Sequence, residues 1–208
     1  MKKQIFILGL VCFSFSMCAS FMWHYLDYEI VLSEVERPTE AKERYGESKI
    51  SSTEEQDYQY VFEDEMIKIL WLIGESQFGF FMTNKTDHSI KIIWDEGAYV
   101  DENNGSHRII HSGVKYAQID DPQPPSVIVR KGTLSDIVVP SDAIYYSGGW
   151  QQRYLLPTAQ MAGDPNLFLD ENRKLIGKNI QVLLPIQIED VTNDYIFIFK
   201  INDVNLRQ

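Results

Sequence analysis

Apolar and polar residues alternate along most of the chain after residue 25. This period of two is typical of strands that bury one face. The alternation is clearest in residues 180–188 and 195–201, which the polar stretch Glu189–Asp194 separates. The two segments predict an antiparallel hairpin. Because proline donates no backbone hydrogen bond, Pro185 predicts a sheet edge or a bulge within the first strand.

Similar segments recur at short intervals before this hairpin. We expect strands at residues 26–32, 58–62, 67–73, 78–82, 90–94, 126–130, 137–139 and 143–146. Only Pro165–Ile176 predicts a helix, with Gly177 as the residue after its C-cap. About ten short strands with turns between them predict an all-β protein, an antiparallel β-sandwich, for which an immunoglobulin-like arrangement is one form.

Residues 37–56, RPTEAKERYGESKISSTEEQ, interrupt the alternation. They are polar and charged without a sustained period, which predicts a long loop. A short helix across Thr39–Tyr45 is compatible with that loop. We expect residues 25–208 to form a single domain that contains it, since this length suits one domain.

The first 24 residues predict an N-terminal signal peptide or membrane anchor helix. Lys2 and Lys3 precede an uncharged, mainly apolar run, Ile5–Trp23, which is long enough to span a bilayer. Phe15–Cys18 resembles a bacterial lipobox, which makes Cys18 the candidate for lipidation, although Met17 occupies a position that usually holds glycine or alanine. A lipoprotein, a cleaved signal and an uncleaved anchor are the three alternatives. Each predicts an exported body outside the cytoplasm, and the lipid or anchor would hold that body at the membrane of the cell envelope.

Composition excludes several functions. The 208 residues carry a formal net charge of −11, which argues against nucleic acid as a partner because phosphate binding requires a basic surface. Both cysteines, Cys12 and Cys18, precede the body, so the body has no disulfide, no thiol nucleophile and no cysteine-based zinc site. We expect no cofactor, with calcium as the one weak candidate.

The calcium candidate lies in the stretch AYVDENNGSHRIIH. Asn104-Gly105 predicts a hairpin turn between strands at Ala98–Asp101 and His107–Ile110. Asp101 and Asn103 offer oxygen ligands at alternate positions, yet an EF-hand would also need glycine at 106 and an acid at 112. A plain turn is the main interpretation, and a cation-bound turn is the alternative. His107 and His111 would lie about 13 Å apart on a strand, too far to share one ion.

The segment YYSGGWQQRY predicts a binding surface. Its two glycines permit a flexible loop that bears large side chains able to stack on a sugar or hold a peptide. The five candidate residues are Tyr145, Tyr146, Trp150, Arg153 and Tyr154. The alternative is that these aromatic rings fold back over an open end of the sandwich.

Catalytic motifs are absent from the sequence. It contains no G-x-S-x-G, S-x-x-K, H-E-x-x-H or P-loop pattern. Asp95 and Glu96, or the run Glu63–Glu65, could supply paired carboxylates for glycoside hydrolysis, but no sequence feature sets their separation.

The stretch Phe62–Pro140 resembles a group of uncharacterised bacterial envelope lipoproteins. The similar segments are FEDEMIKILW, FFMTNKTDHSIKIIWDEGAYVD, SHRIIHSGVKY and QPPSVIVRKG, with DYIFIFKI further on. The resemblance implies a secreted β-sandwich and carries no activity or site residue with it.

These observations together predict an exported, envelope-associated, non-enzymatic protein. Its role would be structural, or it would bind an envelope protein or a glycan. The alternatives are an envelope-polymer hydrolase that uses paired carboxylates and a calcium-stabilised adhesion module.

Overall fold

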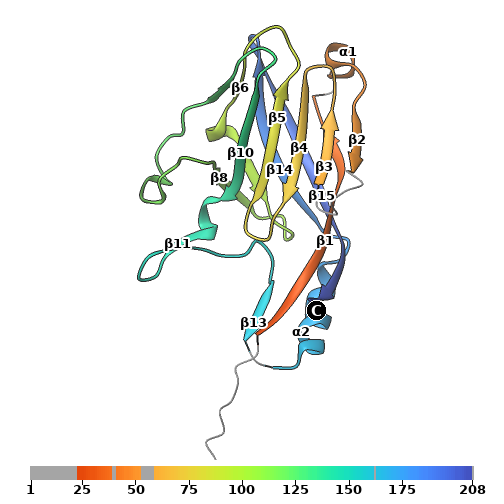
Figure 1. Cartoon of the computed structure of the whole chain (residues 1–208), viewed down its shortest axis with the longest axis vertical. Coiled ribbons are helices and arrows are strands. Elements are labelled where there is room, and N and C mark those ends of the chain that lie inside the picture. Colours follow the sequence, from red (N-terminus) through yellow and green to blue (C-terminus); the bar gives the residue numbers. More distant parts are fainter. Residues whose placement is uncertain (1–22, 39–40, 53–58, 162, 208) are drawn as a thin grey trace, which may run out of the picture.

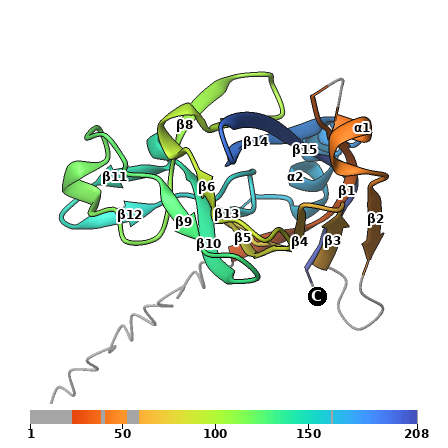
Figure 2. The ribbon, with the colours of Figure 1, turned by 90° about the horizontal axis from the view of Figure 1, so that it is seen from above.

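The described residues form one strongly curled antiparallel sheet and a separate two-stranded sheet (Figures 1 and 2). A computed structural model describes residues 23–38, 41–52, 59–161 and 163–207. The predicted all-β, antiparallel class is confirmed. Within the described residues, eleven strands follow one another in the order β13-β1-β15-β14-β7-β8-β10-β5-β4-β3-β2, while β6 pairs with β14 and β9.

The strands and helices have the following bounds. The strands are β1 Trp23–Glu36, β2 Lys49–Ser52, β3 Gln59–Glu63, β4 Ile67–Ile73, β5 Phe78–Asn84, β6 Ile90–Ile92, β7 Ala98–Val100, β8 Ser106–Ile110, β9 Ser126–Ile128, β10 Thr133–Pro140, β11 Ile144–Tyr146, β12 Trp150–Gln152, β13 Ala159–Met161, β14 Asn179–Ile188 and β15 Val191–Leu206. The helices are α1 Ala41–Tyr45 and α2 Pro165–Asn172, with 3₁₀ turns η1 Trp94–Glu96, η2 Tyr116–Gln118, η3 Ser141–Ala143 and η4 Arg173–Leu175.

The expected two-sheet sandwich is replaced by a half-barrel. Strand β8 joins two halves of the sheet, which are β13-β1-β15-β14-β7 and β10-β5-β4-β3-β2. It pairs with β7 on one side and with β10 on the other. Alternation along a strand shows that one face is buried. It does not show whether two buried faces belong to separate sheets or to one sheet that curls back on itself, so the sandwich prediction was wrong on this point.

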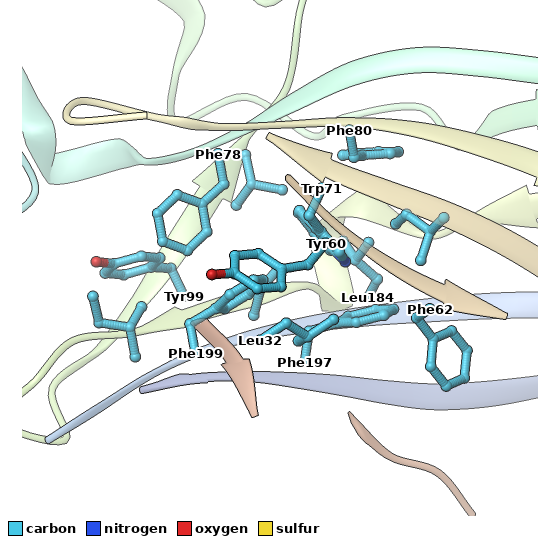
Figure 3. Close-up of a cluster of buried hydrophobic side chains, with 14 of the residues drawn as sticks. Leu32, Tyr60, Phe62, Trp71, Phe78, Phe80, Tyr99, Leu184, Phe197 and Phe199 are labelled. Carbon is cyan, nitrogen blue, oxygen red and sulfur yellow. The ribbon is translucent and has the colours of Figure 1, made fainter. Parts of the chain in front are cut away.

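Aromatic rings from both halves fill the space inside the curl (Figure 3). The Trp71 ring on β4 lies 4.9 Å from that of Phe197 and 5.4 Å from that of Phe199, both on β15. Phe80 on β5 lies 5.3 Å from Trp71. The four side chains are at most 1% exposed. Their edge-to-face and tilted contacts add to the large apolar area that each ring removes from water.

The hairpin predicted near the end of the sequence is present as β14 and β15. Its turn is shorter than expected, because β15 begins at Val191 and leaves Glu189-Asp190 as the connection. Glu189 has a φ of 54°, the left-handed conformation that such tight turns use.

Pro185 does not lie at the predicted sheet edge, and the register between β14 and β15 is regular at this residue, so that pairing has no bulge either. Strand β14 pairs along its whole length with β15, and on its other side with β7 at residues 181–183 and with β6 at 186–188. Pro185 falls between these two short partners, and its carbonyl accepts a hydrogen bond from the N–H of Ile93. The missing proline N–H therefore falls between the two ladders that β14 forms with β6 and with β7.

The predicted helix is confirmed, with α2 continued by η4 up to Leu175. Asp164 caps α2 by accepting a hydrogen bond from the N–H of Asn166, and Gly177 has the positive φ expected after the helix, 87°. Within the predicted loop 37–56, the described residues 41–52 contain α1 and the edge strand β2, so this part is not a plain loop. The sequence of β2, KISS, is polar as edge strands often are, and so it gives no apolar alternation to detect.

The predicted signal or anchor over residues 1–24 and the lipidation candidate Cys18 fall almost wholly outside the described residues, which begin at Trp23. Of the helices in the described segments, none has the length and apolar character needed to cross a bilayer.

One buried carboxylate ties the two halves together at one end of the sheet. Asp64, between β3 and β4, accepts hydrogen bonds from Arg37 after β1 at 3.2 Å and from the hydroxyl of Tyr195 on β15 at 3.0 Å. The backbone N–H groups of Met66 and Ile67 donate to its second oxygen. The Asp64 side chain is fully buried, and the Arg37 side chain is 11% exposed. Burial and the adjacent Asp64 carboxylate raise the pKa of Tyr195, so its hydroxyl remains a donor.

We predict that Asp64→Ala lowers the free energy of unfolding by about 3–5 kcal/mol, since it leaves the buried guanidinium of Arg37 unpaired. Glu63→Ala is the matched control, because Glu63 pairs with Lys85 at the surface with 41% exposure. The control should change stability by about 1 kcal/mol or less. Urea unfolding of the variants measures both values, and equal losses would contradict a special role for Asp64.

Candidate binding site

The predicted binding residues lie on and beside a hairpin that stands apart from the main sheet. Strands β11 and β12 form their own two-stranded sheet (Figure 2), and in it Tyr146 pairs with Trp150. The turn between them contains Gly148 with a φ of 66°, a conformation that glycine adopts without strain. Tyr145, Tyr146, Trp150 and Tyr154 are 44%, 69%, 44% and 43% exposed. The aromatic rings are therefore largely accessible.

The two faces of this hairpin carry different groups. Tyr146 and Trp150 share one face, where their rings meet edge to face at 5.6 Å, and Tyr116 lies 6.0 Å from Trp150. Tyr145 points to the other face, where the guanidinium of Arg153 lies 5.9 Å from its ring. This distance fits a cation–π contact. The hairpin thus presents an aromatic face and a mixed aromatic and cationic face.

An acidic pocket of about 170 Å³ opens beside the hairpin. It combines residues that are distant in the sequence, from the β7–β8 turn that contains Asp101 and from the segment Arg153–Leu155. Its lining residues are Tyr99, Asp101, Glu102, His107, Pro140, Asp142, Ala143, Arg153, Tyr154 and Leu155. The structure thus brings Asp101, Arg153 and Tyr154, three of the sequence-predicted residues, to one site.

His107 connects two carboxylates in this pocket. Its Nε2 lies 3.0 Å from Asp101 and its Nδ1 lies 3.1 Å from Asp142. A neutral imidazole can donate from only one nitrogen, so both contacts are hydrogen bonds only when the ring carries two protons. Because Asp101 belongs to the β7–β8 turn and Asp142 to η3, the histidine holds the two walls of the pocket together.

The hydroxyl of Tyr99 has no hydrogen-bond partner, although the residue is only 3% exposed. Tyr99 lines the acidic pocket, and Figure 3 shows its oxygen at the outer margin of the aromatic cluster. Burial, followed by the nearby carboxylates of Glu102, Asp101 and Asp142, raises the pKa of Tyr99, so the phenol keeps its proton. A buried hydroxyl without a partner is costly, and here it offers a donor to an occupant of the pocket.

The predicted calcium ligands are engaged by hydrogen-bond donors. Asp101 Oδ1 accepts from the N–H groups of Asn103 and Gly105, and Asn103 Oδ1 accepts from Lys178 Nζ at 2.8 Å. Burial alone would raise the pKa of Asp101, but the hydrogen bonds from His107, Gly105 and Asn103 together lower it. In the described residues, no group of three or more His, Cys, Asp or Glu side chains is placed to hold a metal ion. A calcium ion at Asp101 and Asn103 would have to displace these donors.

The Asn104-Gly105 turn itself is confirmed. It joins β7 to β8, and Asn104 has a φ of 65°. A Cβ on Gly105 would lie 2.7 Å from Asp101 Oδ2, so only glycine lets the Asp101 carboxylate fold over the turn.

The second histidine belongs to a different cluster, as the spacing predicted. The His111 ring stacks on Trp94 with centroids 4.3 Å apart, and its Nδ1 lies 3.2 Å from Asp136 on β10. Burial by itself would raise the pKa of Asp136, but hydrogen bonds from His111, Ser112 and Ile137 together lower it. Asp136, Asp142 and Tyr99 were not among the candidate residues predicted from the sequence. The detectable signal for Asp136 was a single acid inside an apolar strand pattern.

Three of the five carboxylates considered for hydrolysis, Asp95, Glu63 and Asp64, are engaged in other contacts. Asp95 accepts hydrogen bonds from Arg108 at 2.9 Å and from the N–H of Gln123 at 3.1 Å. Glu63 pairs with Lys85, and Asp64 is the buried carboxylate of the β3–β4 connection. Asp95 and Asp64 therefore anchor the fold.

We predict that Tyr99→Phe leaves the free energy of unfolding unchanged or raises it by about 1 kcal/mol, because the removed hydroxyl has no partner. The matched control is Tyr195→Phe, which removes a hydroxyl bonded to Asp64. The control should lose about 1.5–3 kcal/mol, the range for a hydrogen bond to a charged group. A comparable loss in Tyr99→Phe, measured by urea unfolding, would show that the Tyr99 hydroxyl stabilises the fold.

Comparison of the chain with protein-family models, with curated proteins and with solved structures gave no match. The resemblance to bacterial envelope lipoproteins therefore stays a prediction from the sequence, and the role of the site has to be argued from its residues.

Proposed function

We propose that this protein is a non-enzymatic, exported binding protein of the cell envelope, and that the β11–β12 hairpin and the acidic pocket contact a partner protein. The observation that carries the proposal is the juxtaposition of exposed Tyr and Trp side chains with a pocket that contains an unpartnered buried hydroxyl. Tyr, Trp and Arg are the residues that dominate the energetics of protein interfaces.

Charge indicates what the partner presents. Asp101, Glu102 and Asp142 face the pocket, against Arg153 and His107. The whole chain carries a net charge of −11, which favours the approach of a basic segment. A Lys or Arg side chain of the partner would enter the pocket, while apolar neighbours of that residue would rest on the aromatic hairpin.

Ring geometry favours a protein over a glycan. The Tyr146 and Trp150 planes meet at 80° and the Tyr116 and Trp150 planes at 68°. Rings at these angles form no flat platform on which a sugar ring could stack, whereas protein side chains fit between angled rings. A binding role also agrees with the engaged state of Asp95 and Asp64, which the hydrolase alternative would require to be available.

Selection of random peptides on the immobilised protein tests this proposal. We predict enrichment of peptides that carry Lys or Arg next to an aromatic or aliphatic residue. Trp150→Ala and Asp142→Asn should each weaken the selected peptides about thirtyfold or more, the loss that corresponds to 2 kcal/mol at an interface hot spot. Leu167→Ala is the control, because Leu167 is a 58% exposed apolar residue on α2, away from the hairpin.

Circular dichroism of each variant separates loss of binding from loss of the fold. Peptides whose affinity is indifferent to Trp150 and Asp142 would contradict the proposed site. Binding on a glycan array that depends on these residues, without any peptide selection, would replace the protein partner by a glycan.

The location in the envelope rests on the sequence of residues 1–24 alone. We predict that the mature protein purified from bacterial membranes carries a diacylglyceryl mass on Cys18, measured by mass spectrometry of the N-terminal peptide. Cleavage after Ser20 without lipid would mean a released exported protein. An intact Met1 in a cytoplasmic fraction would contradict export.

A further inference from the structure

The structure contains a second cavity, about 220 Å³ in volume, whose lining is mainly apolar. It lies between the two halves of the curled sheet, at the end of β4 opposite Asp64. Its walls come from β1, β14, the β4–β5 turn and the segment 153–158 between β12 and β13. We call this segment the strap. The apolar lining residues are Leu26, Ile30, Ile73, Phe78, Leu155, Leu156 and Ile180.

The polar side chains that line the interior are already satisfied. The Tyr28 hydroxyl donates to the Pro157 carbonyl at 2.8 Å, and the Thr158 hydroxyl donates to the Leu156 carbonyl at 3.1 Å. Of the buried side-chain atoms without a partner in the described residues, none belongs to this cavity. The interior therefore offers a ligand apolar contact alone, which excludes sugars and other polyhydroxylated molecules from its depth.

The strap that covers the cavity is anchored on both sides. The N–H of Leu155 donates to the Glu75 carbonyl at 2.8 Å, and the N–H of Leu26 donates to the Thr158 carbonyl at 2.8 Å. These bonds hold the strap in place over the space below. An apolar cavity of about 150 Å³ that surrounding side chains keep open stays dry and accepts benzene. The present cavity is larger, so it has room for a short alkyl chain.

The mouth of the cavity carries an unbalanced charge. Asp27 and Glu75 line it, and Arg207 forms ion pairs with both, at 2.7 Å to Asp27. Each carboxylate is 43% exposed, so solvent and a ligand head group can reach them. Two carboxylates and one guanidinium leave one negative charge. A monocation would neutralise the mouth, whereas an anionic head group would be repelled.

We propose that this cavity binds the alkyl chain of a single-chain cationic amphiphile, with its ammonium group at Asp27 and Glu75 beside Arg207. This site is separate from the acidic pocket and does not depend on the proposed protein partner. The ligand class follows from two features, an apolar interior narrower than most drug-sized sites and a mouth with one excess negative charge.

Titration calorimetry of the wild-type protein with alkylammonium ions from butyl to decyl, below their micelle concentrations, tests the proposal. We expect saturable binding of one ion per chain. The affinity should rise about fourfold per methylene, the effect of burying one such group, and level off when the chain fills the cavity. Alkanoates of the same length should bind at least tenfold more weakly.

Two variants examine the two halves of the site. Ile73→Phe places a larger side chain in the wall, where Ile73 is only partly buried, and should lower the affinity at least tenfold. Glu75→Gln removes the excess negative charge and should bring ammonium and carboxylate ligands to similar affinities. Glu96→Gln, which removes an exposed carboxylate outside the cavity, should behave as the wild type.

Three results would overturn the proposal: no saturable binding of any alkylammonium ion, equal affinities in wild type and folded Ile73→Phe, or alkanoates that bind as tightly as the ammonium ions. If Ile73→Phe does not fold, Glu75→Gln tests the proposal instead. An unchanged preference for ammonium over carboxylate ligands in that variant would show that Glu75 does not hold the head group. Asp142→Asn, which lies in the acidic pocket, should keep the wild-type affinity for alkylammonium. Failure of the protein-partner proposal is therefore distinguishable from failure of this one.

Discussion

The fold depends on a single buried carboxylate that fastens the two halves of a curled sheet. A sheet that folds back on itself brings together strands that are distant in sequence, and their separation must be fixed at the open ends. Asp64 does this at one end by binding Arg37 beyond β1 and Tyr195 on β15. The Tyr45 hydroxyl, which donates to Asn193 at 2.6 Å, adds a second buried tie in the same region. Between these polar contacts and the strap lies the aromatic core of Trp71, Phe197 and Phe199.

The opposite end of the sheet is closed differently, and this difference produces the apolar cavity. No buried ion pair spans the described residues there. Instead the strap at 153–158 crosses the opening and bonds to β1 and to the β4–β5 turn, while Arg207 bridges Asp27 and Glu75 at the surface. A bridging loop held by backbone hydrogen bonds leaves space beneath it that a close-packed sheet end would not. The cavity is thus a consequence of how the curled sheet ends.

Much of the secondary structure could be predicted from the sequence, because period-two alternation is a local property. Ile180, Val182 and Leu184 lie on one face of β14 and are fully buried, as the pattern indicates. The closure of the sheet could not be predicted, because β8 is a short strand whose pairing with β10 involves only Ile109 and Ile110. Pro185 shows the same limit: its lack of a backbone N–H is local chemistry, but the interruption between β6 and β7 beside it arises from two other strands.

The candidate sites show why side chains are harder to assign than strands. Asp101, Arg153 and Tyr154 were identifiable as unusual polar and aromatic groups, yet only the tertiary fold brings them to one pocket with Tyr99 and Asp142. Leu155 lines both that acidic pocket and the apolar cavity. The Leu155 side chain of the strap therefore separates the acidic pocket from the apolar cavity. A change at Leu155 acts on both spaces, whereas a change at Asp142 or at Ile73 acts on one. This asymmetry makes the two sites experimentally separable although they share a wall.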